Sequence, residues 1–323
     1  MSPFNLSRRA FTLGAAAGAI AFPLRSFARP DVLRLVVGFP PGGTLDFVAR
    51  TIAQQFSHEL QQQVIVENKG GANGVIGGEF VSRATPDMGT LWLSSVGAVA
   101  ISRHLQKMTF DPLTDVTPVS LVVRNVEVLL VNVNAPYNTA TELVAAARSG
   151  KPLTIASPGS GSVPHLALEL LNHVAGTKML HVPYRGGGPA VNDLMAGHVD
   201  GYFTDIPGVI GLLKSGRVKP IGLTAEDRHP LFPDIKTFKE QGIAGIDADN
   251  WNGLFAPKDS KPEDVARVSD ALRRTLETPS VKAALDVSGA KPAPSSPAEM
   301  AALLKQDSAK WGKLIRERGI TAD

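Results

Sequence analysis

The 323-residue sequence contains no cysteine. Disulfide bonds, a cysteine nucleophile and thiolate metal sites are therefore excluded, although the chain is compatible with an oxidising compartment. The seven histidines are scattered, and none occurs in His-x-x-x-His or His-Glu-x-x-His, the spacings that put two metal ligands on one helix face. Gly-Lys-Ser/Thr is also absent, which excludes a nucleotide-binding P-loop. We therefore expect no metal and no cofactor.

The chain beyond its N-terminus has little net charge. The first 28 residues hold Arg8, Arg9 and Arg25 and no acidic residue. Without them, Lys and Arg fall from 33 to 30 and match the 30 Asp and Glu, so the formal net charge falls from +3 to zero. A neutral surface without a stripe of cations gives no electrostatic reason to expect nucleic acid as a partner.

The N-terminus is typical of an export signal. Paired arginines precede an apolar stretch, Leu13–Phe22, and small residues follow at Ser26 and Ala28. This order predicts a signal peptide over residues 1–28 and a periplasmic protein that begins near Arg29. The arginine pair resembles a twin-arginine signal, although Sec export remains open. The alternative, a buried N-terminal helix, is disfavoured by the arginine pair, and the apolar stretch is too short to span a bilayer.

Strand-like and helix-like segments alternate along the rest of the chain. Val48, Ile52, Phe56 and Leu60 recur every four residues after a β-rich run at 33–37, as on the apolar face of a helix. The alternation predicts an α/β fold with mostly parallel sheets flanked by helices. Residues 262–276 and 297–318 predict two further helices, each of which begins at a proline.

The length of the chain favours two domains. Apolar segments at 126–133 and 251–256 are suited to carry the chain from one domain to the other and back. We therefore expect a discontinuous first domain, residues 29–128 plus 252–323, with a second domain, residues 129–251, inserted into it. A ligand would bind in the cleft between them, and we expect a monomer.

Three loops repeat one design, in which a Gly- or Pro-rich loop joins a strand to the start of a helix. They are residues 39–44, 157–162 and 183–189. A helix start exposes backbone N–H groups without internal partners and carries partial positive charge, and glycine lets a ligand approach the backbone closely. Any one loop alone is more often an ordinary turn. Three that converge on one cleft predict a site for a ligand with one or more carboxylates.

A hydrolase is the enzymatic alternative. Ser162, His165 and Asp205 are the residue types of a nucleophile, a base and an orienting acid. However, no Gly-x-Ser-x-Gly elbow occurs, and Ser162 is better placed to cap the helix that contains His165. We therefore expect no catalytic residues and no enzyme.

Seven segments together resemble the Bug-type periplasmic substrate-binding proteins of tripartite tricarboxylate transporters. They cover nearly the whole chain after the signal peptide, in the family's order. The segments are LVVGFPPGGTLD (35–46), VENKGGANG (66–74), PDMGTL (86–91), GSGSVPHL (159–166), HVPYRGGGP (181–189), DLMAGHVD (193–200) and WNGLFAP (251–257).

The resemblance implies a two-lobed Venus-flytrap receptor that closes on its ligand and passes it to membrane permease subunits. In that family the first loop holds a carboxylate through backbone amides and ordered water. The residues that match ligand-binding positions are Phe39, Pro41, Gly42, Gly43, Asp46, Ser95, Gly97, Ser162, His165, Tyr184, Arg185, Gly186 and Asp205.

The family pattern leaves the ligand and the downstream partner open. Thr204-Asp205 stands where an Asp-Asn pair often occurs, and an extra acid at the cleft would disfavour a polyanion such as citrate. A di- or tricarboxylate, an aromatic acid and an acidic amino acid all remain candidates. The same fold would also serve a module that reports its ligand to a membrane sensor kinase.

Overall fold

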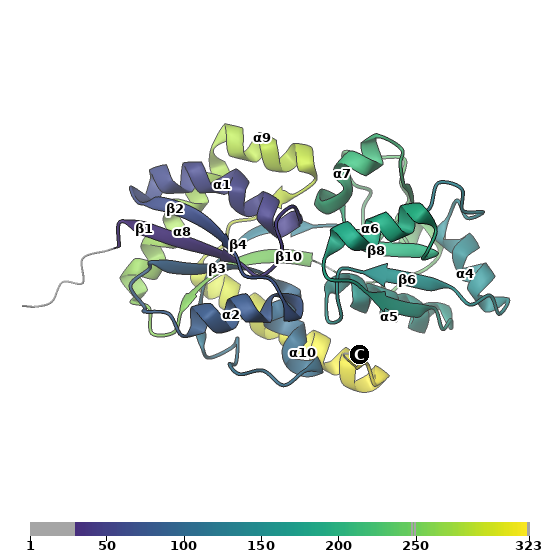
Figure 1. Ribbon diagram of the computed structural model, residues 1–323, viewed down its shortest axis with the longest axis horizontal. Coiled ribbons are helices and arrows are strands. Elements are labelled where there is room, and N and C mark those ends of the chain that lie inside the picture. The colour runs from purple at the N-terminus through teal and green to yellow at the C-terminus, as the bar shows by residue number, and fades with distance from the viewer. Residues whose placement is uncertain (1–29, 247, 249, 322–323) are drawn as a thin grey trace, which may run out of the picture.

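The computed structural model describes residues 30–246, 248 and 250–321. The predicted signal peptide, residues 1–28, lies outside the described residues. The described chain builds two sheets that lie side by side, each with its own helices (Figure 1). We call the sheet that contains β1, together with its helices, the first lobe, and the other sheet with its helices the second lobe.

The first lobe has six strands in the order β11-β4-β10-β3-β1-β2. The strands are β1 (Val32–Val37), β2 (Gln63–Asn68), β3 (Thr90–Ser95), β4 (Val116–Asn125), β10 (Asn250–Pro257) and β11 (Lys291–Pro292). Its helical segments are α1 (Thr44–Leu60), η1 (Ala72–Gly74), α2 (Val75–Ser82), η2 (Gly97–Ile101), α3 (Ser102–Leu105), α8 (Pro262–Glu277), α9 (Pro279–Ser288) and α10 (Pro297–Arg318).

Helices cover both faces of the first sheet. The predicted apolar face of α1 is buried, with Val48, Ile52 and Phe56 fully inaccessible in one core cluster with residues of α8 and α9. Each such side chain contributes roughly 1.5–3 kcal/mol by leaving water. On the other face, where α2 and α10 lie (Figure 1), Trp92 and Trp311 belong to a core cluster to which η2 and α10 contribute. The predicted C-terminal helices are confirmed as α8 and α10.

The second lobe has five strands in the order β7-β6-β8-β5-β9. The strands are β5 (Glu127–Val131), β6 (Thr154–Ser157), β7 (Leu180–Pro183), β8 (Gly201–Asp205) and β9 (Lys219–Leu223). Its helical segments are α4 (Ala140–Arg148), α5 (Val163–Ala175), α6 (Gly187–Ala196), α7 (Ile206–Lys214) and η3 (Lys239–Gln241). Leu166 of α5 and Leu194 of α6 pack in different core clusters, so this sheet is also sandwiched between helices.

The predicted α/β fold is confirmed, but the sheets are mixed rather than mostly parallel. In the first lobe β10 runs antiparallel to both β3 and β4, and in the second lobe β5 runs antiparallel to both β8 and β9. These two strands begin where the chain has just crossed from the other lobe. They therefore run opposite to neighbours whose carboxyl ends face the junction between the lobes.

The chain crosses between the sheets twice. The first crossing lies at residue 126, because β4 ends at Asn125 and β5 begins at Glu127; the second lies between Leu223 and Asn250. Domains divided at 128/129 and 251/252 remain our proposal, and the strand boundaries fall within a few residues of those positions. No helix among the described residues is long and apolar enough to cross a membrane.

Candidate ligand-binding site

A cavity of about 250 Å³ lies between the two lobes. Its walls come from the segments that follow the carboxyl ends of β1, β3, β6, β7 and β8, which is where ligands bind in open α/β sheets. Pockets for drug-sized ligands have volumes of roughly 300–1,000 Å³. The cavity therefore suits a small molecule.

Most of the predicted site residues meet at this cavity. Three of them, Asp46, His165 and Tyr184, do not line it. The predicted residues that do are Phe39, Pro41, Gly42, Gly43, Ser95, Gly97, Ser162, Arg185, Gly186 and Asp205. The three glycine loops thus surround one space, while contact of each residue with a ligand stays a prediction.

Four helices start at the cavity wall. The first turns of α1, α5, α6 and α7 all contribute lining residues, so one more helix start is present than the sequence predicted. The N-caps of α1 and α6 are Gly43 and Gly186, and neither makes a side-chain capping bond. First-turn N–H groups and the helix dipoles therefore give this space a positive potential. Arg185 is the only lysine or arginine among the lining residues.

Asp46 braces the first loop from behind. Its carboxylate accepts hydrogen bonds from the Gly42 amide at 3.0 Å, from Asn68 Nδ2 at 2.9 Å and from Arg50 Nε at 3.0 Å. Gly42 has φ +87°, a conformation that glycine adopts without strain. Burial raises the pKa of Asp46, but the hydrogen bonds from Arg50, Gly42 and Asn68 outweigh it and lower the pKa below its usual value.

Two stacked histidines support the loop at 157–162 in the second lobe. The rings of His165 and His181 lie 3.8 Å apart and 12° from parallel. The Gly161 amide donates to His165 Nδ1 at 3.1 Å, and Ser157 Oγ lies 2.7 Å from His181 Nε2. Burial, with a smaller contribution from His165, lowers the pKa of His181 to about 3. Both rings therefore position the loop from behind the cavity wall.

The same loop argues against the hydrolase alternative. Ser162 Oγ donates its proton to the Gly159 carbonyl oxygen at 2.6 Å and accepts from the His165 amide at 3.3 Å. Ser162 is thus the N-cap of α5, as predicted. Asp205 contacts Thr44 of the first lobe. These hydrogen bonds build a loop and a contact between the lobes and do not activate a nucleophile.

Tyr184 and Arg185 are adjacent in the sequence, but only Arg185 lines the cavity. The Tyr184 hydroxyl donates to Asp193 Oδ2 at 2.6 Å, and burial with this contact raises the pKa of Tyr184 to about 12. Tyr184 lines an adjoining hollow of about 880 Å³ that shares several wall residues with the cavity. Arg185 lines both spaces, is exposed, and has no ion pair among the described residues.

Three hydrogen bonds join the lobes at the cavity, one of them from Asn250 Nδ2 to Glu127 Oε1 at 2.6 Å. Thr44 Oγ1 donates to Asp205 Oδ1 at 2.7 Å, and Asn73 Nδ2 donates to the Gly161 carbonyl oxygen at 2.8 Å. Burial raises the pKa of Asp205, although the Thr44 hydroxyl and the Gly208 amide act in the opposite direction. These hydrogen bonds bridge the cleft between the two lobes.

Sequence reasoning missed several polar wall residues. Thr44 and Asn73 lie inside the segments that resemble the family, so the sequence could have identified them as candidate wall residues. Tyr202 and Asn250 have no such signal, because only folding brings β8 and β10 to the same space. Asn73 Oδ1 and Asn250 Oδ1 are buried and have no hydrogen-bond partner among the described residues.

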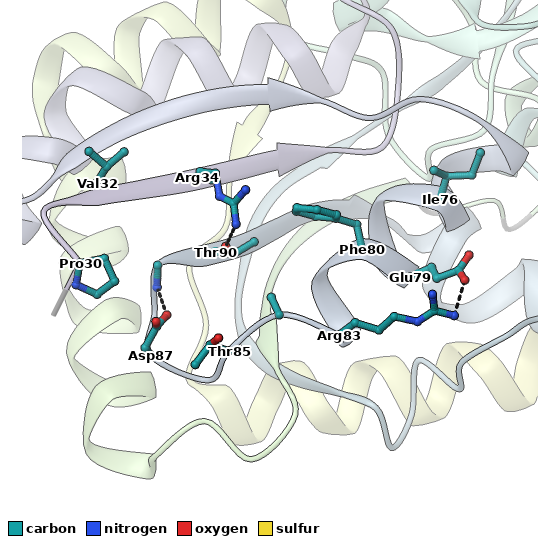
Figure 2. Close-up of a pocket in the computed structure, with 12 residues that line it drawn as sticks. Pro30, Val32, Arg34, Ile76, Glu79, Phe80, Arg83, Thr85, Asp87 and Thr90 are labelled. Atoms are coloured by element: carbon teal, nitrogen blue, oxygen red, sulfur yellow. Dashed lines mark hydrogen bonds and ion pairs between the residues drawn. The ribbon is translucent and has the colours of Figure 1, made fainter. Parts of the chain in front are cut away.

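A larger hollow, of about 670 Å³, lies on the first lobe away from this site (Figure 2). Arg34 Nη2 donates to Thr90 Oγ1 at 3.1 Å, and Arg83 pairs with Glu79 at 2.6 Å, so both cations are already engaged (Figure 2). The hollow adjoins the amino-terminal parts of β1 and β3, opposite to the edge where α/β sheets bind ligands. The described residues contain no cluster of three or more His, Asp or Glu suited to a metal ion.

Residues 48–320 match the family described as tripartite tricarboxylate transporter family receptor. The chain is 37% identical to the UPF0065 protein in the tcbD-tcbE intergenic region of Pseudomonas sp. (strain P51), over 94% of this chain and 89% of that protein. It is 31% identical to protein BugT of Bordetella pertussis (strain Tohama I), over 98% of each.

Two solved structures from Rhodopseudomonas palustris have the same fold. MatC with bound malate is 31% identical, with a TM-score of 0.82 over 88% of this chain and 98% of that chain. Rpa4515 with adipate is 30% identical, with a TM-score of 0.86 over 91% of this chain and 99% of that chain. The predicted two-lobed fold is thereby confirmed, and family and fold are those of substrate-binding receptors rather than of enzymes. The chain belongs to the tripartite tricarboxylate transporter receptor family, the Bug-type family that its sequence resembles.

Proposed function

We propose that this protein is a periplasmic receptor that captures a small carboxylate between its lobes and delivers it to the permease of a tripartite tricarboxylate-type transporter. Membership of the receptor family supports this function. Similarity to structures described as a periplasmic transporter and as the periplasmic binding protein BugD supports the location.

One observation carries the proposal. Helix starts from both lobes face a cavity of about 250 Å³, and two of them have glycine N-caps that leave backbone N–H groups for a ligand. Such a site binds an anion without many cationic side chains. Arg185 adds one guanidinium, which can hold a carboxylate through two hydrogen bonds. The malate and adipate in the two R. palustris structures have the same chemistry.

We assign the wall residues to three parts of the site. We assign Phe39, Pro41, Gly42 and Gly43 to the first-lobe loop that approaches the ligand. Ser95 and Gly97 form the wall behind it, while Ser162, Arg185, Gly186 and Asp205 close the site from the second lobe. Asp46, His165 and Tyr184 do not line the cavity, and we assign them to positioning the loops that do.

Substitution of Gly43 tests the proposed site. Its φ of −87° and ψ of 175° suit a valine, and only the Pro40 carbonyl oxygen, at 3.9 Å, lies near an added Cβ. Gly43→Val should therefore fold normally but obstruct ligand approach to the loop. We expect a loss of affinity of at least tenfold in calorimetric titrations with 4-hydroxybenzoate and with every other carboxylate that the wild-type protein binds.

The matched control is Gly211→Val, which lies on the exposed surface of α7 with no atom within 4 Å of the added Cβ. It should bind like the wild type. Wild-type affinity in Gly43→Val would remove the first loop from the site. Absence of binding to any mono-, di- or tricarboxylate by the wild-type protein would overturn the proposed function itself.

A further inference from the structure

The buried polar atoms without partners on the cavity wall include two hydrogen-bond acceptors. Asn73 Nδ2 donates to Ser102 Oγ at 3.1 Å and to the Gly161 carbonyl oxygen at 2.8 Å. Asn250 Nδ2 donates to Glu127 Oε1 at 2.6 Å. These bonds fix the orientation of both amides, and in each the Oδ1 atom is left without a partner among the described residues.

Asp205 adds a carboxylate to the same wall. Its Oδ1 accepts from Thr44 Oγ1 at 2.7 Å. Asp205 pairs with Glu127 in the register of β8 and β5, and Glu127 in turn holds Asn250. The Asp205 carboxylate and the Asn250 amide therefore belong to one polar region at the junction of the lobes.

The Tyr202 hydroxyl completes this region. It is fully buried, it interacts with the Thr204 side chain, and it lies 3.0 Å from the position of a Cβ at Gly187. A buried polar atom without a hydrogen-bond partner carries a free-energy cost. A ligand that supplies donors at this wall recovers that cost, whereas a ligand without donors does not.

The wall offers a single side-chain cation to a ligand anion. Arg185 is the single lysine or arginine of the lining, and Asp205 is its single acid. Much of the remaining wall is apolar, with Leu45, Val163 and Val191 among its residues. A second ligand carboxylate would find no second guanidinium or ammonium group, and it could not donate to the unpartnered Asn73 and Asn250 oxygens, which only accept hydrogen bonds.

We propose that the cavity selects a carboxylate with one anionic group, an apolar body and a hydrogen-bond donor, either a hydroxyl or an ammonium group, which binds to Asp205 and Asn250 Oδ1. Di- and tricarboxylates are discriminated against by the same residues. This inference rests on the proposed function and narrows its substrate class.

Two matched ligand series test the inference on protein stripped of ligand by unfolding and refolding. The first compares butyrate, 4-hydroxybutyrate, 4-aminobutyrate and succinate, and the second compares benzoate, 4-hydroxybenzoate, 4-(aminomethyl)benzoate and terephthalate. In calorimetric titrations we expect a donor-bearing acid to bind at least tenfold more tightly than both the plain acid and the diacid of its series. In each series, tighter binding of the hydroxy acid would identify the donor as a hydroxyl, and tighter binding of the amino acid would identify it as an ammonium group.

Asp205→Asn replaces one carboxyl oxygen of the wall acid by an amide NH2 donor, and we expect it to reduce the preference for the donor-bearing acid by tenfold or more. Asp234→Asn, which makes the same change on the exposed surface, should keep the preference. Equal or tighter binding of the diacids by the wild type would overturn the inference and leave the receptor function intact. Failure of every carboxylate to bind would instead overturn the receptor function. The wild-type series decides the inference even if Asp205→Asn does not fold.

Discussion

Thr44 and Asp205 face each other across the cleft, and Thr44 Oγ1 donates to Asp205 Oδ1 at 2.7 Å. Thr44 is the first residue of α1 in the first lobe, and Asp205 is the last residue of β8 in the second. Both residues line the cavity between the lobes, so a ligand bound there would lie beside this pair. We infer that the hydrogen bond contributes to the free energy of the closed arrangement as well as to the shape of the site.

Thr44→Val should therefore weaken ligand binding without unfolding the protein. The substitution keeps the volume but removes a hydrogen bond to a buried carboxylate, which contributes about 1.5–3 kcal/mol. We expect a loss of roughly tenfold or more in affinity and a shift towards an open form in solution scattering without ligand. Thr141→Val on the exposed face of α4 is the matched control, and equal affinity in both variants would contradict a role for the contact.

Asp46→Asn should loosen the first loop. The amide nitrogen of the variant would face donors that now bond to the carboxylate, and we expect a loss of about 1–3 kcal/mol in the free energy of unfolding at pH 7. The pKa of Asp46 is lowered in the folded protein. Its stabilising contribution is therefore present above the unfolded pKa of about 3.9 and is lost as the pH falls through the folded pKa.

Chemical denaturation at pH 7 and at pH values below 4 measures this difference. The gap between the wild type and Asp46→Asn should narrow in acid. Asp270→Asn, at an exposed position on α8, should show no gap at either pH. A gap that stays constant with pH would show that the carboxylate charge is unimportant to the loop.

His181 should make the protein less stable in mild acid. Its pKa is about 3 in the folded protein and about 6.5 when unfolded, so the unfolded chain binds the extra proton between these values. The contribution of His181 to the free energy of unfolding therefore increases as the pH rises from 3 to 6.5, and it is lost as the pH falls from 6.5 towards 3. The slope reaches about 1.4 kcal/mol per pH unit.

His181→Gln should reduce the slope of unfolding free energy against pH over this window. A residual slope is expected, because burial also lowers the pKa values of His104 and His229. His173→Gln, at an exposed position, serves as the control. An unchanged slope in His181→Gln would mean that this ring is not held neutral by the loop at 157–162.

Export should depend on the paired arginines. We expect N-terminal sequencing of periplasmic protein to begin near Arg29, because Ser26 and Ala28 provide the small residues of a cleavage site. Replacement of Arg8 and Arg9 by lysine should abolish export if the signal is of the twin-arginine type, and continued export would indicate the Sec route. An intact Met1 in the periplasmic fraction would contradict a cleaved signal.

Local patterns predicted the elements of this fold well. The four-residue spacing of Val48, Ile52, Phe56 and Leu60 marks the buried face of α1, since only one side of that helix meets the sheet. The glycine loops also predicted the edge of the sheets at which the cavity lies. Each of these features is set by residues close together in the sequence.

Strand direction and the deeper wall of the site were not predictable in the same way. The reversed direction of β10 follows from where the chain re-enters the first lobe, which no local pattern records. Asn250 and Tyr202 reach the cavity from strands of different lobes. The family pattern places Asp46 at a ligand-binding position, and in the structure its carboxylate accepts a hydrogen bond from the Gly42 amide.

The central claim is that a small carboxylate binds in the cavity between the lobes, and a thermal-shift screen tests it most directly. Mature protein, unfolded and refolded to remove any bound ligand, is heated with mono-, di- and tricarboxylates, aromatic acids and amino acids. A ligand at a hundredfold excess over its dissociation constant adds about 2.7 kcal/mol of stability. We predict a clear shift of Tm with a selective set of carboxylates, and no shift with any of them would contradict the account.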